Sequence, residues 1–336
     1  MKIISNPTPQ MTKRRRILKR LLWSFAILFV MMNVVAIFHS YKFTHFGGNN
    51  IEKTQKPEQL GFSTKIKTLL FGVDNPRPTN KIKPTGQFET IVLQSNRKID
   101  CWYLDKKDTA NADLVKGTVI LCHGYGGEKS SMLDKAAIFD SLQYNTFLID
   151  FMGSGGSEGN TTTIGFKEAQ QVKTAYEYLK SKGVNNIYLF GTSMGAVAIM
   201  KAVKDYDLQP KGIIIECPFG TMYQTVCARF TNMNVPTFPM AGLLVFWGGL
   251  QNGYWAFGHN PVDYAKKITC PALLLYGEHD KNVSRREIDG IYKNLAGEKT
   301  LKTYQLAGHE NYLTKYKTEW TKDVADFLTV HENVNR

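Results

Sequence analysis

The amino-acid sequence predicts an α/β fold in which helices cover both faces of a mostly parallel β-sheet. Short apolar runs alternate with longer stretches of helical periodicity from about residue 88 to residue 330. Near-continuous apolar runs are typical of strands buried on both faces, as in parallel sheets. Glycine-rich and polar motifs follow several of these runs, and ligands in such sheets bind at the carboxyl ends of the strands.

The expected elements follow in order along the chain. Residues 88–93 and 98–104 are expected to form an antiparallel pair of strands. Further strands are expected at 118–122, 146–151, 186–190, 212–216, 272–276 and 301–305, and helices at 131–142, 164–182, 196–203 and about 312–330. Residues 221–262 separate two strands by far more chain than a crossover requires, and they are rich in large apolar side chains. This segment is expected to form a small helical cap over the strand ends; the alternative is an ordinary covering helix with a long loop.

The N-terminal region carries most of the basic charge. The net charge is +13, yet eight basic and no acidic residues lie in the first 50 positions, so the composition does not indicate nucleic-acid binding. An uncharged run of 18 residues, 21–38, follows the basic cluster and is nearly long enough to cross a bilayer. We expect a basic cytoplasmic tail (1–20), a transmembrane signal-anchor helix (21–41), a linker and lead-in (42–86) and the α/β domain (87–336) across the membrane. The alternative is a cleaved signal peptide, with small residues near Ala36, and a secreted product.

Metals and nucleotides are not expected as cofactors. The five cysteines are scattered and odd in number, and the histidines at 39, 45, 259 and 331 lack metal-ligand spacing. The glycine-rich segment 150–159 lacks the Gly-Lys-Ser/Thr ending of a phosphate-binding loop. Glu168 and Lys173, on the following helix, are interpreted as surface charges.

The most specific motif is G-x-S-x-G at residues 191–195. It lies between an expected strand and an expected helix, where a serine on a sharp turn is held with its hydroxyl exposed above the sheet edge. Gly191 and Gly195 leave room for that turn, because a side chain there would collide with neighbouring backbone. Ser193 is therefore the candidate nucleophile.

A base and an orienting carboxylate follow Ser193 in the chain. Asp280 and His309 each lie in a loop just past an expected strand, so their side chains can converge on Ser193. Glu278 and His279 are the alternative acid and base. The backbone N–H groups of Met194 and Tyr125, the latter in the loop His123-Gly124-Tyr125-Gly126-Gly127, are expected to form an oxyanion hole.

With these motifs in place, residues 87–330 resemble the α/β-hydrolase superfamily. The resemblance is carried by HGYGG at 123–127, DFMGSGGSEG at 150–159, GTSMG at 191–195, GEHD at 277–280 and GH at 308–309. Within the superfamily the chain is similar to membrane-anchored hydrolases of the Bem46 and serine aminopeptidase S33-like groups. The resemblance implies an eight-stranded, mostly parallel sheet and a Ser-Asp-His triad that needs no cofactor. The chain departs from these relatives at Phe151-Met152, where they usually carry an arginine.

The function expected from these residues is serine hydrolysis of a carboxylic ester, in which a small-molecule or lipid ester forms an acyl-enzyme on Ser193. The apolar cap and the membrane helix favour a lipid or acyl substrate. Two alternatives stay open: a peptidase or amidase of the aminopeptidase type, and a catalytically silent binding module. An aminopeptidase needs acidic groups to hold the substrate amine, and the cap offers little beyond Asp263 at its edge.

Overall fold

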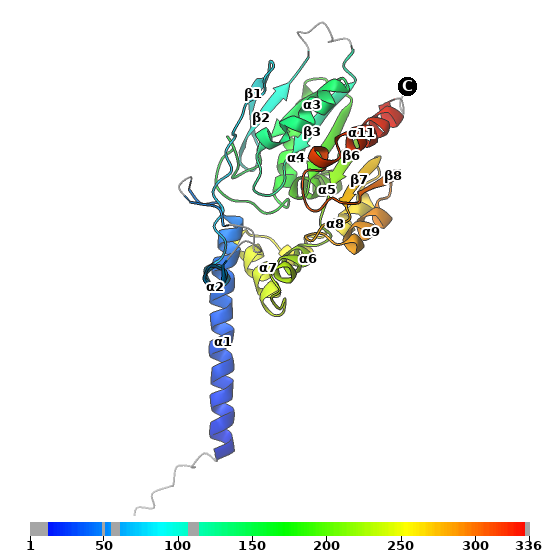
Figure 1. Cartoon of the computed structure of the whole chain (residues 1–336). Coiled ribbons are helices and arrows are strands. Elements are labelled where there is room, and N and C mark those ends of the chain that lie inside the picture. Colours follow the sequence, from blue (N-terminus) through cyan, green and yellow to red (C-terminus); the bar gives the residue numbers. More distant parts are fainter. Residues whose placement is uncertain (1–12, 49–50, 55–60, 107–113, 333–336) are drawn as a thin grey trace, which may run out of the picture.

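The computed structural model describes residues 13–48, 51–54, 61–106 and 114–332. Its centre is an eight-stranded sheet in the order β1-β2-β4-β3-β5-β6-β7-β8 (Figure 1). β2 pairs antiparallel with β1 and β4, and all the other pairs are parallel. The expected mostly parallel, eight-stranded sheet is therefore confirmed. The strands are β1 (Glu89–Gln94), β2 (Lys98–Leu104), β3 (Gly117–Cys122), β4 (Tyr144–Ile149), β5 (Ile187–Thr192), β6 (Gly212–Glu216), β7 (Ala272–Gly277) and β8 (Lys299–Tyr304).

Helices cover both faces of this sheet. One face packs against α4 (Glu168–Ser181), α5 (Met194–Tyr206), α8 (Pro261–Tyr264) and α9 (Arg285–Asn294). The other packs against α3 (Leu133–Ser141), α10 (Tyr312–Lys315) and α11 (Lys317–Glu332). The strands from β3 to β7 are almost entirely buried, as their uninterrupted apolar sequences require.

Residues 221–262, here called the cap segment, form α6 (Met222–Asn232), α7 (Met240–Gln251) and the start of α8. The Thr221 side chain caps α6 by accepting a hydrogen bond from the Gln224 backbone N–H. In Figure 1, α6 and α7 lie on the side of the sheet from which the long N-terminal helix departs.

That N-terminal helix, α1 (Lys13–Thr44), projects from the domain (Figure 1). It is the single described helix long and apolar enough to cross a membrane, with a mean hydropathy of 2.4 over its best window and only 6% of that window buried. Residues 1–12 of the expected cytoplasmic tail lie outside the described residues.

The lead-in after α1 is held against the α/β domain. A short helix, α2 (Phe62–Phe71), contacts α1. Arg77 then donates hydrogen bonds to the carbonyls of Gly155, Ser157 and Gly159 at 2.8, 2.5 and 3.0 Å. The guanidinium thus holds the extended chain on the glycine-rich segment that follows β4.

Candidate active site

Ser193 occupies a strained turn between β5 and α5. Its φ of 51° and ψ of −110° lie in a region that residues with a side chain rarely adopt. A Cβ at Gly191 would lie 2.5 Å from the carbonyl carbon of Gly195, and one at Gly195 would lie 2.2 Å from the Cys122 carbonyl oxygen. Glycine is therefore required on both sides of the serine. The Ser193 N–H donates to the Glu216 carbonyl over 2.8 Å, which fixes the turn to the end of β6.

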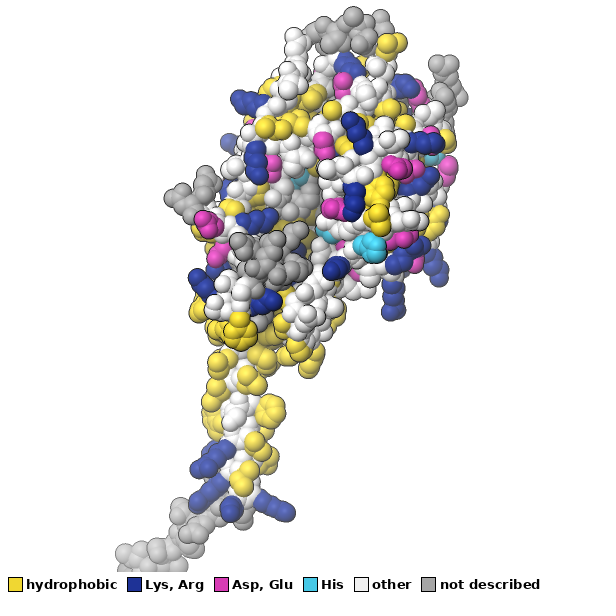
Figure 2. Space-filling view, in the orientation of Figure 1, with side chains coloured by type: hydrophobic (Ala, Val, Ile, Leu, Met, Phe, Trp, Pro, Cys, Tyr) yellow, Lys and Arg dark blue, Asp and Glu magenta, His cyan; other side chains and the backbone are white. Residues whose placement is uncertain are grey.

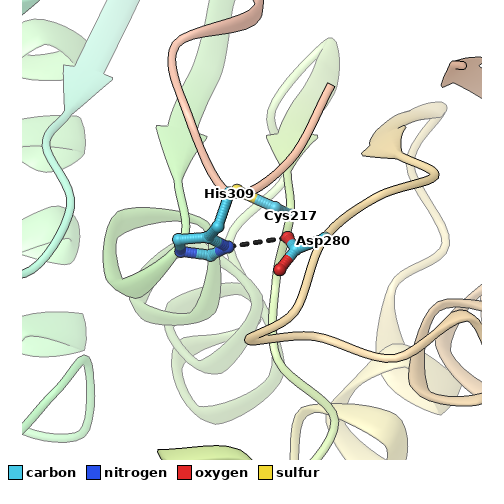
Figure 3. A group of neighbouring side chains, drawn as sticks. All are labelled: Cys217, Asp280 and His309. Carbon is cyan, nitrogen blue, oxygen red and sulfur yellow. Dashed lines mark hydrogen bonds and ion pairs between the residues drawn. The ribbon is translucent and has the colours of Figure 1, made fainter. Parts of the chain in front are cut away.

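The structure brings Ser193, His309 and Asp280 into one chain of hydrogen bonds. His309 Nε2 lies 3.1 Å from Ser193 Oγ, and His309 Nδ1 lies 2.7 Å from Asp280 Oδ2. Figure 3 shows the imidazole facing the carboxylate across the ends of neighbouring loops. The neighbouring residues Glu278 and His279 are exposed, and Asp280 rather than either of them faces His309.

Asp280 is held as an acceptor of several hydrogen bonds. Its side chain is buried, and Oδ1 accepts from the backbone N–H groups of Asn282 at 2.7 Å and Val283 at 2.9 Å. The second oxygen, Oδ2, is thereby left for His309. Such contacts fix the orientation of the carboxylate and, through it, the tautomer of the imidazole.

The electrostatic surroundings favour the charged form of His309. Burial disfavours the imidazolium, but the neighbouring Cys217 and Asp280 favour it, and together they raise the pKa of His309 well above its ordinary value. About a quarter of the side chain (25%) is exposed, so the ring still meets solvent at its Ser193 edge. An imidazole in these surroundings is a stronger base than a free one.

Cys217 completes the group drawn in Figure 3. It follows β6 with a φ of 39°, is buried, and its side chain was missed as a site neighbour in the sequence. The donor atoms of Cys217, Asp280 and His309 lie within 4.8 Å of one another. Zinc bonds of about 2.0–2.1 Å would hold two tetrahedral ligands about 3.3 Å apart. The 2.7 Å contact between His309 and Asp280 is shorter, so this arrangement suits a hydrogen bond better than a shared ion.

The two expected oxyanion donors both lie close to the Ser193 turn in the structure. Met194 is the first residue of α5, where backbone N–H groups have no partner within the helix. Tyr125 lies in the glycine-rich loop after β3, and a Cβ at the adjacent Gly124 would lie 3.8 Å from Ser193 Cβ. No group in the described part of the chain accepts a hydrogen bond from the N–H of Met194 or Tyr125.

His123 fixes the start of this loop. Its Nδ1 lies 2.8 Å from the Gly124 carbonyl, and its Nε2 lies 3.1 Å from the Phe151 N–H, so the ring donates to the former and accepts from the latter. Burial lowers the pKa of His123, which keeps the ring neutral as this pairing requires.

The C-terminal end of α1 also contacts the loop that contains Tyr125. The Tyr125 ring stacks on Phe43 with centroids 4.6 Å apart, and its hydroxyl donates to the Phe43 carbonyl over 2.7 Å and accepts from Asn75 over 3.1 Å. The guanidinium of Arg229, on α6, lies 4.0 Å from the Phe43 ring centroid. No local pattern in the sequence indicates these contacts, because they join residues far apart in the chain.

Glu168 is not a surface charge, contrary to the expectation from sequence. It is fully buried and accepts hydrogen bonds from the hydroxyl of Thr162, from both the hydroxyl and the N–H of Thr163, and from the N–H of Gly165. The Thr162 hydroxyl also lies 3.4 Å from the Met194 sulfur. Glu168 thus organises the loop of residues 162–165, which contacts the start of α5. Lys173 forms a partly exposed pair with Glu177, as expected for a surface residue.

Known proteins with similar sequences and folds agree with this architecture. The family model described as serine aminopeptidase, S33, matches residues 113–246. Protein bem46 of Schizosaccharomyces pombe is 28% identical over 67% of this chain and 73% of its own length. The lysophosphatidylserine lipase ABHD12 of Xenopus tropicalis is 21% identical over 56% of this chain and 49% of its own length. The esterase Pf2001 of Pyrococcus furiosus superposes with a TM-score of 0.63 at 21% identity, covering 76% of this chain and 97% of that protein. The chain is therefore similar to the serine aminopeptidase S33-like family of α/β-hydrolases, the resemblance that its motifs indicate, and it shares its fold with a solved esterase.

Proposed function

We propose that this protein is a membrane-anchored serine esterase with Ser193, His309 and Asp280 as its catalytic triad. The observation that carries the proposal is the unbroken series of hydrogen bonds from Ser193 Oγ through His309 to Asp280, with distances of 3.1 and 2.7 Å. Asp280 orients the imidazole and stabilises it when it becomes charged.

In the proposed reaction, Ser193 Oγ attacks the ester carbonyl carbon while its proton passes to His309 Nε2. The negative charge on the carbonyl oxygen is stabilised by the N–H groups of Met194 and Tyr125. The tetrahedral intermediate then expels the alcohol, which takes its proton from His309, and an acyl-enzyme is left on Ser193. Water attacks this acyl group with His309 again as the base, releasing the carboxylic acid and restoring the serine.

An ester substrate is favoured over a peptide with a free amino terminus. No Lys, Arg, Asp or Glu occurs from Phe230 to Val262, so most of the cap segment offers no carboxylate for a substrate amine. The proteins similar to this chain include a lysophosphatidylserine lipase and an esterase. These observations support a carboxylic ester with an apolar acyl chain.

The proposed anchor is α1, with the N-terminus in the cytoplasm and the hydrolase domain on the opposite side. The cluster Lys13–Arg20 precedes the apolar stretch, and positive charge is retained on the cytoplasmic side.

A covalent probe tests the proposed nucleophile. The full-length protein should be labelled by a fluorophosphonate and should hydrolyse p-nitrophenyl butyrate, and Ser193→Ala should lose labelling and at least about 10⁴-fold in kcat. Ser181→Ala, which alters an exposed serine at the end of α4, is the matched control and should behave as wild type. Wild-type protein that takes up no probe would contradict the proposal. Faster turnover of aminoacyl p-nitroanilides than of esters would instead favour the peptidase alternative.

A further inference from the structure

The cap segment packs on the part of α1 that is long and apolar enough to cross a membrane. Trp247 Nε1 donates a hydrogen bond to Asn33 Oδ1 over 2.9 Å, and Gln251 Nε2 donates to the Ile37 carbonyl over 2.9 Å. Ser40 Oγ lies 3.1 Å from Gln251 Oε1. These contacts satisfy the polar groups of Asn33 and Ser40, which would otherwise face lipid.

The position of these contacts along α1 places α7 within the membrane. A helix rises about 1.5 Å per residue, so Asn33 lies about 20 Å beyond Arg20, the last charge before the apolar run. The hydrocarbon core is about 30 Å thick, so Asn33 lies inside it and Ser40 lies at its far boundary. Trp247, bonded to Asn33, is then below the level of the lipid headgroups on the side of the hydrolase domain.

The N-terminal end of α7 lies deeper in the bilayer than its C-terminal end. Its contacts move outward along α1, from Asn33 at Trp247 to Ile37 and Ser40 at Gln251, so the two helices run in the same direction. The first turn of α7 and the loop before it are therefore the deepest part of the cap segment.

The composition and exposure of this region suit a lipid environment. The stretch from Phe230 to Val262 has no charged residue, although Phe238, Leu250 and Trp255 are 84, 59 and 65% exposed. Figure 2 shows the hydrophobic side chains of α1 continuing onto the adjoining end of the domain, while Lys and Arg side chains gather at the far end of the helix. Exposed apolar surface of this kind marks a membrane or protein contact.

The short helix α2, which also contacts α1, adds further exposed apolar side chains. It exposes several large apolar side chains, and Lys65 and Lys67 lie between them in the sequence. A short helix with apolar and basic residues is typical of one that lies in the headgroup region. Among the described side chains of α2, Phe62, Ile66, Leu70 and Phe71 are apolar and exposed.

We propose that α7 and the loop before it are embedded in the lipid leaflet nearest the hydrolase domain, packed against α1. The domain then rests on the bilayer through this surface, and a lipid ester reaches the site from that leaflet. The statement on substrate entry rests on the proposed esterase function, whereas the embedding of the cap segment does not.

Spin labels measure the embedding directly. In full-length protein in lipid nanodiscs, Cys227→Ser removes the one cysteine that is not buried. A nitroxide is then attached after Phe238→Cys or Leu250→Cys. Ile27→Cys, on the exposed surface of α1, provides the lipid reference, and Val330→Cys, on the exposed face of α11, provides the water reference. Accessibility to oxygen, which concentrates in lipid, is compared with accessibility to a water-soluble nickel complex.

The expected result is a high ratio of oxygen to nickel accessibility at 238 and 250, as at 27, and a low ratio at 330. A low ratio at both cap positions would show that they face water and would overturn the proposal. Low accessibility to both reagents would also overturn it, because it would mean that a second copy of the chain covers this face. The measurement uses no substrate, so its failure is distinct from a failure of the esterase proposal.

Discussion

At Asp280, two backbone N–H groups and one imidazole share a single buried carboxylate. The N–H groups of Asn282 and Val283 occupy Oδ1, so Oδ2 has one partner, His309. Asp280, and not the preceding acid Glu278, therefore faces His309. Glu278 lies two residues earlier in the chain and is exposed.

The carboxylate at 280 should set the pH dependence of the reaction. His309 acts as a base only when neutral, so activity should rise as pH increases through the raised pKa of His309. Asp280→Asn removes one of the groups that raise this pKa, so the acidic limb of the kcat/KM profile should move to lower pH. At the optimum, kcat should fall by roughly 10³–10⁴-fold.

Glu278→Gln is the matched control for this substitution and should leave both the limb and kcat near wild type. The measurement is kcat/KM for p-nitrophenyl butyrate from pH 5 to pH 10. A limb that stays in place in Asp280→Asn would mean that another group titrates.

At the scale of elements, α1 contacts the proposed oxyanion loop and helps to position it. Its last turn supplies both the ring that stacks on Tyr125 and the carbonyl that accepts the Tyr125 hydroxyl. The loop is also fixed from within the domain by His123. The backbone N–H of Tyr125 is thus positioned from two sides, one of them the helix proposed to cross the membrane.

Phe43→Ala should therefore slow the reaction without removing the nucleophile. Loss of the stacked ring loosens Tyr125, and small displacements of catalytic groups cost up to about 100-fold in rate. We expect kcat for p-nitrophenyl butyrate to fall about tenfold or more, with KM less affected. Phe38→Ala, on the same helix with a side chain that is 59% exposed, is the matched control and should retain wild-type kcat. Equal effects of the two substitutions would contradict a positioning role for Phe43.

For the whole molecule, the proposed topology predicts where the C-terminus lies. Expressed in Escherichia coli, a C-terminal alkaline phosphatase fusion should be active and a green fluorescent protein fusion dark, because the C-terminus follows the hydrolase domain across the membrane. Intact mass should include α1, since cleavage near Ala36 would remove Asn33 and its bond to Trp247. A bright fluorescent fusion would show that the C-terminus is cytoplasmic and would contradict the proposed topology. A protein whose mass lacks α1 would favour the signal-peptide alternative.

Local signals predicted most of the sheet and the nucleophile turn. The strands at 98–104 and 212–216 have the bounds expected from their apolar runs. The turn at Ser193 could be predicted because Gly191 and Gly195, which it requires, lie within two residues of the serine. Helix α9 was missed although its capping box, Ser284 with Glu287, is present in the sequence.

Contacts between distant segments had no such signal. Glu168 was expected to be exposed because a glutamate in the first turn of a helix usually is. Its burial depends on the loop before α4, which folds over the carboxylate and donates hydrogen bonds to it. The contact between Tyr125 and Phe43 joins residues 82 positions apart and depends on where α1 meets the domain. The position of Cys217 beside His309 depends in the same way on the order of neighbouring strands.

The three hydrogen bonds of Arg77 have a consequence for which substrates can react. They attach the chain between α1 and β1 to the loop after β4, so this segment does not act as a flexible linker between α1 and the domain. Under the proposed anchoring, Ser193 works at one fixed height relative to the bilayer plane. The protein would then select substrates by the depth of the ester bond in the bilayer, and ester bonds above or below that height would not react.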